Sequence, residues 1–338
     1  QMDYQYIYEY ARRGVLMPLD GFIPKPMDIS SFGPQRLQSG KVDGKLYGIT
    51  VGDNAYGIGH DVDALKAADC ELPDDLTWDS FRDLCAKFAK ANTKPNYFAT
   101  ASLGGDLQAF QIWLRQDGKD LYTADGFGFT AADLEPWLTY WQDMSKSGYA
   151  ASADIQGLFQ DTLETNLDAT GHTAMAAHWS NEIAPVSALV KFTFDVSPFP
   201  QRTAGGKSGM YLKPSQFMSI CAKTTNPEPS AALINYLTNT LTAATDQGVD
   251  TAIPPSPTVR AALLPSLSEI SKRSVAFVAK AEKRADPLPL PPLPGNGEVA
   301  KAFEDNNMQI LFGNVSPKDA ASAFMDQANG ILARAKSS

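Results

Sequence analysis

The sequence predicts an α/β protein built from two lobes. Segments of strand character alternate with segments of helical periodicity, a pattern typical of helices that cover the faces of mostly parallel sheets. The chain has 338 residues, more than one hydrophobic core usually serves, so two lobes are expected. With 43% hydrophobic and 20% charged residues, the composition is that of a folded globular protein rather than a disordered chain.

The first elements are a helix and a strand that is interrupted by glycine. Residues Tyr4–Arg13 carry apolar side chains at helical spacing and stop at Gly14, a suitable left-handed C-cap. Residues Gly44–Val51 follow as an apolar strand. The triplet Gly52-Asp53-Asn54 predicts a turn before the strand resumes at Ala55–Gly59, and the chain is expected to change lobe there.

The middle of the chain predicts three helices. Thr77 is a good N-cap for a helix whose apolar residues recur at spacings of three and four: Trp78, Phe81, Leu84, Cys85 and Phe88. The same periodicity marks Leu107–Gln116 and Asp133–Lys146. We expect most of the aromatic rings in these helices to belong to a core.

The last third of the chain returns to alternating elements. Strands are predicted at Thr173–Trp179 and Ser215–Ala222, and a helix at Ser230–Leu241. The proline-rich segment Pro287–Pro294 can be neither helix nor central strand, so it predicts an extended connector. Two further helices are expected, at Glu298–Leu311 and Pro317–Ala335.

Charge and hydropathy exclude some classes of partner. The net charge of −9 at pH 7 would repel the phosphates of a nucleic acid, whose binding requires clustered Lys and Arg. No apolar run approaches the ~20 residues that a membrane-spanning helix needs. No signal peptide opens the chain, so any export signal is expected to have been removed.

The cysteines show no metal-ligand spacing, and we expect neither a metal nor a cofactor. Cys70 and Cys85 flank the start of one predicted helix, and two interpretations stay open: a short-loop disulfide or two free thiols. Cys221 lies in an apolar run and is expected to be a buried strand residue.

Catalytic patterns are weak. His60, His172 and His178 form no zinc-binding helix signature, and the two later ones are expected at a surface or cleft edge. No nucleophile elbow or phosphate-binding loop is present. A secreted glycosidase remains an alternative, for which Asp53 and Glu182 would be the pair of carboxylates. The primary expectation is that no residue is catalytic.

Five segments carry a resemblance when they are taken in order. They are Met2-Asp3-Tyr4 followed by Tyr10–Asp20, then Gly40–Val51, then Leu72-Pro73 with Leu76–Phe81, then Gly171–Trp179, and finally Thr225–Leu237. Together they resemble the family 1 extracellular solute-binding proteins, the class of sugar receptors that includes maltose-binding protein. The likeness spreads over nearly the whole chain, and each match is weak by itself.

The resemblance implies a two-lobed periplasmic-binding-protein fold of class II with a hinge and a ligand cleft between the lobes. The N-terminal lobe would comprise residues 1–52 and 212–284, and the C-terminal lobe residues 53–211 and 285–338. Family members normally begin with several dozen residues that are not found here, so the resemblance implies that the first part of the N-terminal lobe is absent from this chain. The hinge would lie near residues 51–55, 206–214 and 283–290.

The functional expectation is the substrate-binding component of an ABC sugar importer, which captures a mono- or oligosaccharide by closing on it. The resemblance implies a secreted, periplasmic monomer, free or lipid-anchored, whose partners are a carbohydrate and the permease subunits. The same frame serves other ligands, so a polyol, a sulfonated glycoside or a peptide stays an alternative. Arg202 and Lys207 could then pair with an anionic group, although a solvated basic loop is the preferred explanation for them.

Sugar recognition needs aromatic plates for the apolar faces of the ring and planar polar groups for its hydroxyls. The polar candidates are Asp3, which the resemblance assigns, and Asp53, Asn54 and Asn296, each of which is also explained by a turn. The aromatic candidates are Trp179, Tyr211 and Phe110. Their alternatives are a core tryptophan, a tyrosine that packs on a turn, and, preferred for Phe110, a core phenylalanine.

Overall fold

The structure is a computed structural model that describes residues 1–4, 6–160, 162–249 and 252–337. The chain forms two compact units. Unit 1 comprises residues 1–55, 179–184 and 211–288, and unit 2 comprises residues 56–178, 185–210 and 289–338. The expected lobe boundaries at 52/53, 211/212 and 284/285 therefore shift by one to four residues. The segment 179–184 also moves to unit 1, because Ser180 hydrogen-bonds to Asn54 and Ala55.

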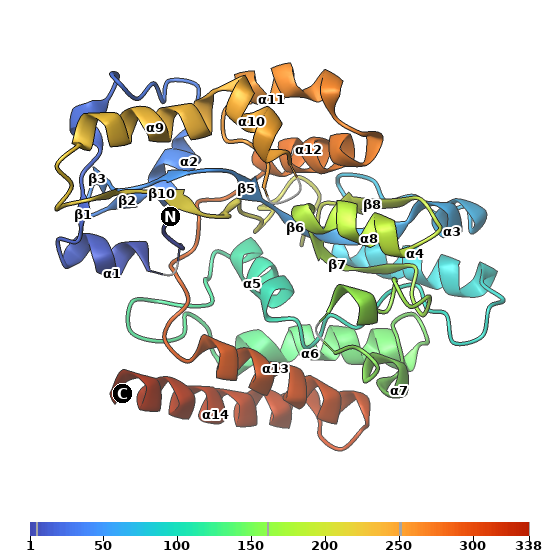
Figure 1. Cartoon of the computed structure of the whole chain (residues 1–338). Coiled ribbons are helices and arrows are strands. Elements are labelled where there is room, and N and C mark those ends of the chain that lie inside the picture. The colour runs from blue at the N-terminus through green and yellow to red at the C-terminus, as the bar shows by residue number, and fades with distance from the viewer. Residues whose placement is uncertain (5, 161, 250–251, 338) are drawn as a thin grey trace. The chain divides into compact units, whose positions relative to one another are not determined.

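Unit 1 contains short strands and peripheral helices (Figure 1). Its helices are α1 (Ile7–Arg12), α2 (Pro34–Ser39), α9 (Pro227–Asn239), α10 (Leu241–Gln247), α11 (Pro257–Leu263) and α12 (Glu269–Glu282), with single 3-10 turns at Asp20–Phe22, Ser180–Glu182 and Leu264–Ser266. Its strands are β1 (Leu16–Met17), β2 (Lys41–Val42), β3 (Lys45–Leu46), β4 (Ile49–Thr50), β5 (Asp53–Asn54), β9 (Lys213–Pro214), β10 (Phe217–Met218) and β11 (Ile220–Cys221).

The strands of unit 1 pair across a long separation in the sequence. Antiparallel pairs join β1 to β11, β4 to β10 and β5 to β9, so residues 213–221 run along residues 16–54. The backbone is closely approached at Gly48, where a Cβ would lie 2.9 Å from the Cβ of Phe217 and 2.8 Å from Ile7 Cδ1. Two apolar clusters fill the unit; one contains Leu19, Ile49 and Ile234, and the other Ile7, Leu16 and Phe217.

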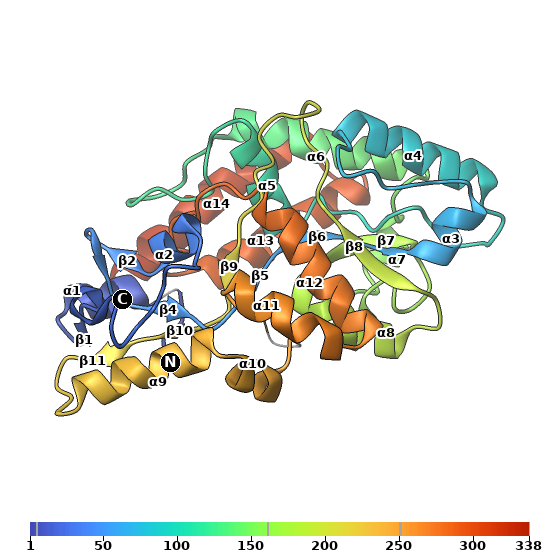
Figure 2. The ribbon, with the colours of Figure 1, turned by 90° about the horizontal axis from the view of Figure 1, so that it is seen from above.

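Unit 2 is a sheet covered by longer helices (Figure 2). Its helices are α3 (Val62–Ala67), α4 (Trp78–Ala91), α5 (Leu107–Gln116), α6 (Ala131–Lys146), α7 (Ala153–Gln156), α13 (Asn296–Leu311) and α14 (Pro317–Ser337), with a 3-10 turn at Leu163–Thr165. Its strands are β6 (Tyr56–Asp61) and β8 (Phe194–Ser197); β7 (Met175–Trp179) and α8 (Ile183–Leu189) each cross a boundary between the units.

The sheet of unit 2 has the order β7-β6-β8. The pair β6–β8 is antiparallel, and isolated parallel bridges extend the sheet through Phe98–Thr173 and Thr100–Ala150. The expectation of mostly parallel sheets is therefore wrong for the strand pairs whose direction is described in either unit. The α/β class holds, and helices α13 and α14 pack beside α6 in Figure 1.

An aromatic core holds the helices of unit 2 together. Trp78 makes edge contacts with three tryptophan rings, at centroid distances of 5.1 Å for Trp113, 5.6 Å for Trp137 and 6.3 Å for Trp141. The predicted N-cap of α4 is present, since Thr77 Oγ1 accepts from the backbone N of Ser80 and Ser80 closes a capping box.

Several element predictions are confirmed and others are wrong. Helix α5 has the predicted bounds, and the proline-rich segment is extended. Asp53 and Asn54 form strand β5 rather than a turn, because they pair with residues 213–214. Cys70 and Cys85 are buried free thiols, and Cys221 is exposed on edge strand β11 rather than buried.

Candidate functional site

Strand β5 carries two adjacent candidate residues with different surroundings. Successive side chains of a strand point to opposite faces, so Asp53 and Asn54 face opposite sides of the β5–β9 pair. The Asp53 side enters a network of charges, and the Asn54 side meets Ser180. This alternation separates a structural carboxylate from a candidate ligand-binding amide.

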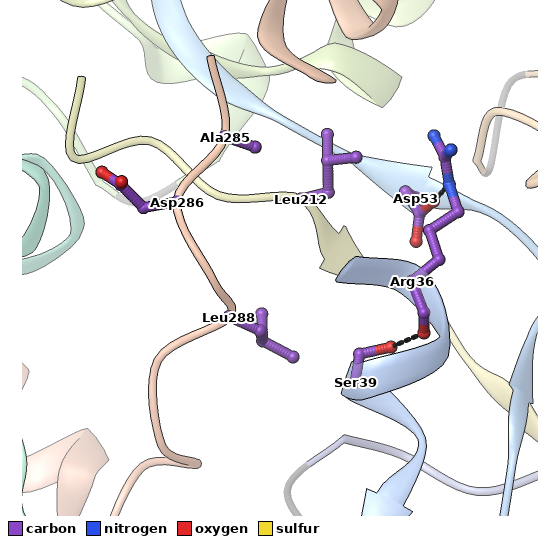
Figure 3. Close-up of a pocket in the computed structure, with 7 residues that line it drawn as sticks. All are labelled: Arg36, Ser39, Asp53, Leu212, Ala285, Asp286 and Leu288. Atoms are coloured by element: carbon purple, nitrogen blue, oxygen red, sulfur yellow. Dashed lines mark hydrogen bonds and ion pairs between the residues drawn. The ribbon is translucent and has the colours of Figure 1, made fainter. Parts of the chain in front are cut away.

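The carboxylate of Asp53 is enclosed in an ion network of unit 1. Only 1% of Asp53 is exposed, and Oδ2 accepts a hydrogen bond from Nε of Arg36 on α2 (Figure 3). Arg36 Nη1 also donates to Oε1 of Glu282, the last residue of α12, and Arg260 Nη2 donates to Glu282 Oε2 at 2.7 Å. Two cations thus balance two anions in a partly dry environment.

Burial and pairing shift the pKa values of this network in different directions. Burial raises the pKa of the Asp53 carboxyl above its ordinary value, and the charge of Arg36 opposes the shift. Burial also acts on Glu282, but the hydrogen bonds and charges of Arg36 and Arg260 outweigh it and lower the pKa of that carboxyl. Burial lowers the pKa of the Arg260 guanidinium. In this network, the opposite charges offset part of the free-energy cost of removing the ionised groups from water.

A cavity of about 10 Å³ lies beside the network, and Figure 3 shows Arg36 and Asp53 on one side of it and the segment 285–288 on the other. Leu212 and Ser39 complete the lining. A volume of this size holds about one water molecule, so no sugar fits there. Three segments that line the cavity lie close in sequence to boundaries between the units: residue 53, residue 212 and residues 285–288.

Asn54 lies next to the predicted aromatic platform. Ser180 Oγ donates to Asn54 Oδ1 at 3.1 Å, and the backbone N of Ala55 donates to Ser180 Oγ at 3.2 Å. The backbone N of Ser180 donates to the carbonyl of Ala55 at 2.8 Å. These bonds hold the end of β7, with Trp179, against the end of β5. Two of the predicted ligand residues, Asn54 and Trp179, are therefore brought together within unit 1.

Trp179 is half-buried, and its ring makes a cation–π contact with a lysine. The ammonium of Lys213 lies 5.0 Å from the centroid of the Trp179 ring, and Lys213 is the register partner of Asn54 across the β5–β9 pair. Glu182 Oε2 accepts from the backbone N of Trp179 at 3.1 Å, which fixes the turn after β7. Asn54 and Ser180 are buried, Trp179 is half-buried and Lys213 is exposed; we call these four residues the Trp179 surface.

Two further candidates in unit 1 lie elsewhere in the hydrogen-bond network. Asp3 precedes helix α1: its carbonyl accepts from the backbone N of Ile7 at 3.2 Å, and its Oδ2 accepts from Gln216 Nε2 at 3.2 Å. The ring of Tyr211 is 7% exposed, as expected of the packing alternative. The ligand roles of Asp3 and Tyr211 remain predictions.

The two candidates in unit 2, Phe110 and Asn296, contact other side chains of that unit. Phe110 is fully buried and stacks on Phe303 at 5.3 Å between centroids, so it is a core residue and not a ligand wall. Asn296 is the first residue of α13 rather than part of a turn, because Gly295 takes the left-handed conformation before it. Asn296 Oδ1 accepts from Tyr122 Oη at 2.7 Å, and its ligand role remains a prediction.

His178 is buried, so the expectation that it lies at a surface or cleft edge is wrong. Its Nε2 lies 2.8 Å from Oδ2 of Asp168, and neither side chain is exposed. The imidazole also makes an edge contact with Phe194 at 5.2 Å between centroids. The pair anchors the residue that precedes Trp179.

Sequence reasoning missed Arg36, Ser180 and Lys213. Arg36 lies in a short helix with a weak pattern, and nothing local indicates that its partners are 17 and 246 residues away. Ser180 directly follows the predicted residue Trp179, and Lys213 lies two residues after the predicted residue Tyr211. Proximity to these residues along the chain was the available signal.

Neither a cluster of metal ligands nor a membrane-spanning helix is found among the described residues. No three His, Cys, Asp or Glu side chains in that part of the chain are grouped so that they could hold a metal ion. Among the same residues, no helix combines the length and the apolar character that crossing a membrane requires.

The class of protein follows from the fold and the sequence together. Residues 1–277 match the family described as bacterial extracellular solute-binding protein, which is most of the chain. The chain therefore belongs to the bacterial extracellular solute-binding protein family, and its resemblance to that class of receptor is confirmed. Its function is to bind a solute outside the cytoplasm.

Solved structures of other solute-binding proteins share the fold of this chain. An extracellular solute-binding protein of family 1 from Alicyclobacillus acidocaldarius is 32% identical, with a TM-score of 0.89 over 98% of this chain and 83% of that one. A periplasmic oligogalacturonide-binding protein from Yersinia enterocolitica is 22% identical, with a TM-score of 0.80 over 99% and 84%. An ABC substrate-binding protein from Listeria monocytogenes, solved with cycloalternan, is 18% identical, with a TM-score of 0.72 over 98% and 84%. The two-lobed periplasmic-binding-protein fold is thus the fold of this chain.

Proposed function

We propose that this protein is the carbohydrate-binding component of an ABC importer. The observation that carries the proposal is the Trp179 surface, where an indole ring, an amide and a hydroxyl meet at the ends of β5 and β7. Two proteins of the same fold bind carbohydrates: one is an oligogalacturonide-binding protein, and the other was solved in complex with cycloalternan. Both support a carbohydrate as the solute.

The chemistry of the Trp179 surface suits a sugar. An indole face offers the broad apolar area that the C–H face of a pyranose can cover, and Trp179 is half-buried. The amide of Asn54 both donates and accepts hydrogen bonds, as the hydroxyls of a sugar require. Its Oδ1 already accepts from Ser180, so the amide is oriented before a ligand arrives.

We further propose that capture proceeds by hinge closure. The hinge would comprise residues 51–55, 206–214 and 283–290, which include the unit boundaries at 55/56, 210/211 and 288/289. A ligand that contacts both units favours the closed state by its differential affinity. The closed, monomeric protein would then deliver the sugar from the periplasm to the permease subunits.

The proposed role is binding without catalysis. The glycosidase alternative needs two carboxylates that reach a substrate, one of them as a proton donor. Asp53 is enclosed by Arg36, and Glu182 accepts a backbone hydrogen bond from Trp179. Incubation with oligosaccharides should therefore release no reducing ends, and hydrolysis that is abolished in Asp53→Asn would favour the alternative.

The binding proposal is tested by titration calorimetry and by thermal shift against mono- and oligosaccharides, neutral and acidic. A sugar that binds only the folded protein raises the melting temperature by mass action. Trp179→Ala should weaken binding of the best sugar by about tenfold or more, because the stacking plate is lost.

A matched control is Tyr236→Ala on α9. Tyr236 is an aromatic residue of unit 1 that is 42% exposed and lies outside the Trp179 surface, so its removal should leave affinity unchanged. Equal affinities of the wild type and Trp179→Ala would contradict the site. The absence of any sugar ligand across the panel would contradict the function.

A further inference from the structure

Lys213 is a surface cation placed on the aromatic plate itself. It is exposed, its ammonium lies 5.0 Å from the ring centroid of Trp179, and it lies opposite Asn54 in the β5–β9 pair. Among the described residues, no carboxylate forms an ion pair with Lys213. Its partner in this structure is therefore the π face of the indole.

The surrounding charges leave Lys213 uncompensated. Glu182 belongs to the same turn as Trp179, but its carboxylate accepts from the backbone N of Trp179, and no ion pair joins it to Lys213. Asp53 precedes Asn54 on β5, yet it faces the other side of the strand pair and is neutralised by Arg36. Among the described residues, the lysine is thus a positive charge without a carboxylate partner, in a protein of net charge −9.

The position of this cation distinguishes between neutral and acidic sugars. A neutral sugar that stacks on the face covered by Lys213 must displace the ammonium and offers it no charged replacement. A sugar with a carboxylate can stack on the ring and pair with the displaced ammonium, and such charge-assisted hydrogen bonds are stronger than neutral ones. The flexible four-carbon stem of lysine allows the ammonium to move from the ring to the carboxylate.

We infer that the Trp179 surface binds a sugar acid, with a pyranose on the Trp179 ring and its carboxylate on Lys213 Nζ. The inference rests on the proposed function, since it assumes that Trp179 is the sugar platform. Asn54 would bind a hydroxyl of the same ring, because its backbone is fixed opposite Lys213 by the strand register.

The test uses matched pairs of sugars, galacturonate with galactose and glucuronate with glucose, together with their disaccharides, titrated into the whole chain. The wild type should bind the better uronate about tenfold or more tightly than its neutral counterpart. Uronate affinity should fall as sodium chloride rises, whereas neutral-sugar affinity should not.

Variants of Lys213 isolate the carboxylate contact. Lys213→Met should weaken uronate binding about tenfold and so remove the preference for the uronate over the neutral sugar, and Lys213→Arg should restore most of the uronate affinity. Because Lys213 is exposed, the melting temperature of each unliganded variant should match that of the wild type. Lys223→Met removes an equal charge from an exposed site of unit 1 and should change neither affinity.

The outcomes separate this inference from the proposed function. If neutral sugars bind through Trp179 at least as tightly as their uronates, or if Lys213→Met leaves uronate affinity unchanged, the inference is overturned and the carbohydrate function stands. If no sugar, neutral or acidic, binds in a manner that depends on Trp179, both are overturned.

Discussion

Replacement of Arg36 by methionine should destabilise unit 1 more than any surface charge change. Arg36 is 4% exposed and contacts two carboxylates, of which Asp53 is 1% exposed. Glu282 keeps Arg260 as a partner in the variant, whereas Asp53 becomes a buried carboxylate without its cation. Breaking a buried pair in this way costs about 3–5 kcal/mol of unfolding free energy.

That cost should be visible in the melting temperature. In a domain of 150–250 residues each kcal/mol shifts the midpoint by about 2–4 °C, so Arg36→Met should lower it by about 6–20 °C. Differential scanning calorimetry and urea unfolding measure the change. Arg12→Met, which breaks an exposed pair with Asp43, serves as the matched control and should leave the midpoint within experimental error.

A double variant tests the reason for the loss. Arg36→Met combined with Asp53→Asn removes the stranded charge while keeping the shape of the side chain, so it should recover most of the lost stability. The reasoning is refuted if the single variant unfolds like the wild type, or if the double variant is no more stable than the single one.

Three further predictions concern the same chain. Glu282→Gln should destabilise the protein at neutral pH, and this loss of unfolding free energy should shrink as pH falls below 4.5, the ordinary pKa of a glutamate. Because the pKa of Glu282 is lowered in the folded protein, its carboxylate stabilises the fold above pH 4.5, and that contribution is lost when the group is protonated. A loss of stability that does not vary with pH would contradict the ion pairing. Thr77→Ala should cost about 0.5–2 kcal/mol of unfolding free energy through the lost N-cap of α4, with sugar affinity unchanged; equal denaturation midpoints would contradict the cap. Gly48→Ala should cost about 1–3 kcal/mol, since its methyl would meet Phe217 and Ile7, and a wild-type melting curve would contradict that close approach.

Local sequence patterns predicted the elements whose stability is local. Helix α5 and the start of α4 were predicted because their apolar spacing and the N-cap at Thr77 act within one segment. The helices α10 to α12, between residues 241 and 282, were missed, although α12 buries Val275, Phe277 and Val278 on one face. Strand β5 was predicted as a turn because Gly52-Asp53-Asn54 has turn chemistry, which pairing with residues 213–214 overrides.

The candidate site divides in the same way. Asn54 and Trp179 were named from their residue types and from the family resemblance, and the structure brings them together through Ser180. Phe110 was named by type as well, but its burial against Phe303 makes it part of the core. A residue type shows what a side chain is able to bind, whereas exposure depends on which segments fold over it.

The sequence by itself determined the class of fold, the family and the chemical types suited to a sugar, because periodicity, capping and ordered motifs are written along the chain. Only the tertiary structure decided that Asp53 forms an ion pair with Arg36 and that the ammonium of Lys213 lies over the ring of Trp179. Partners separated by 17 or more residues meet only when strand register and helix packing place them in contact. Desolvation then decides which charges stay paired and which remain available to a ligand.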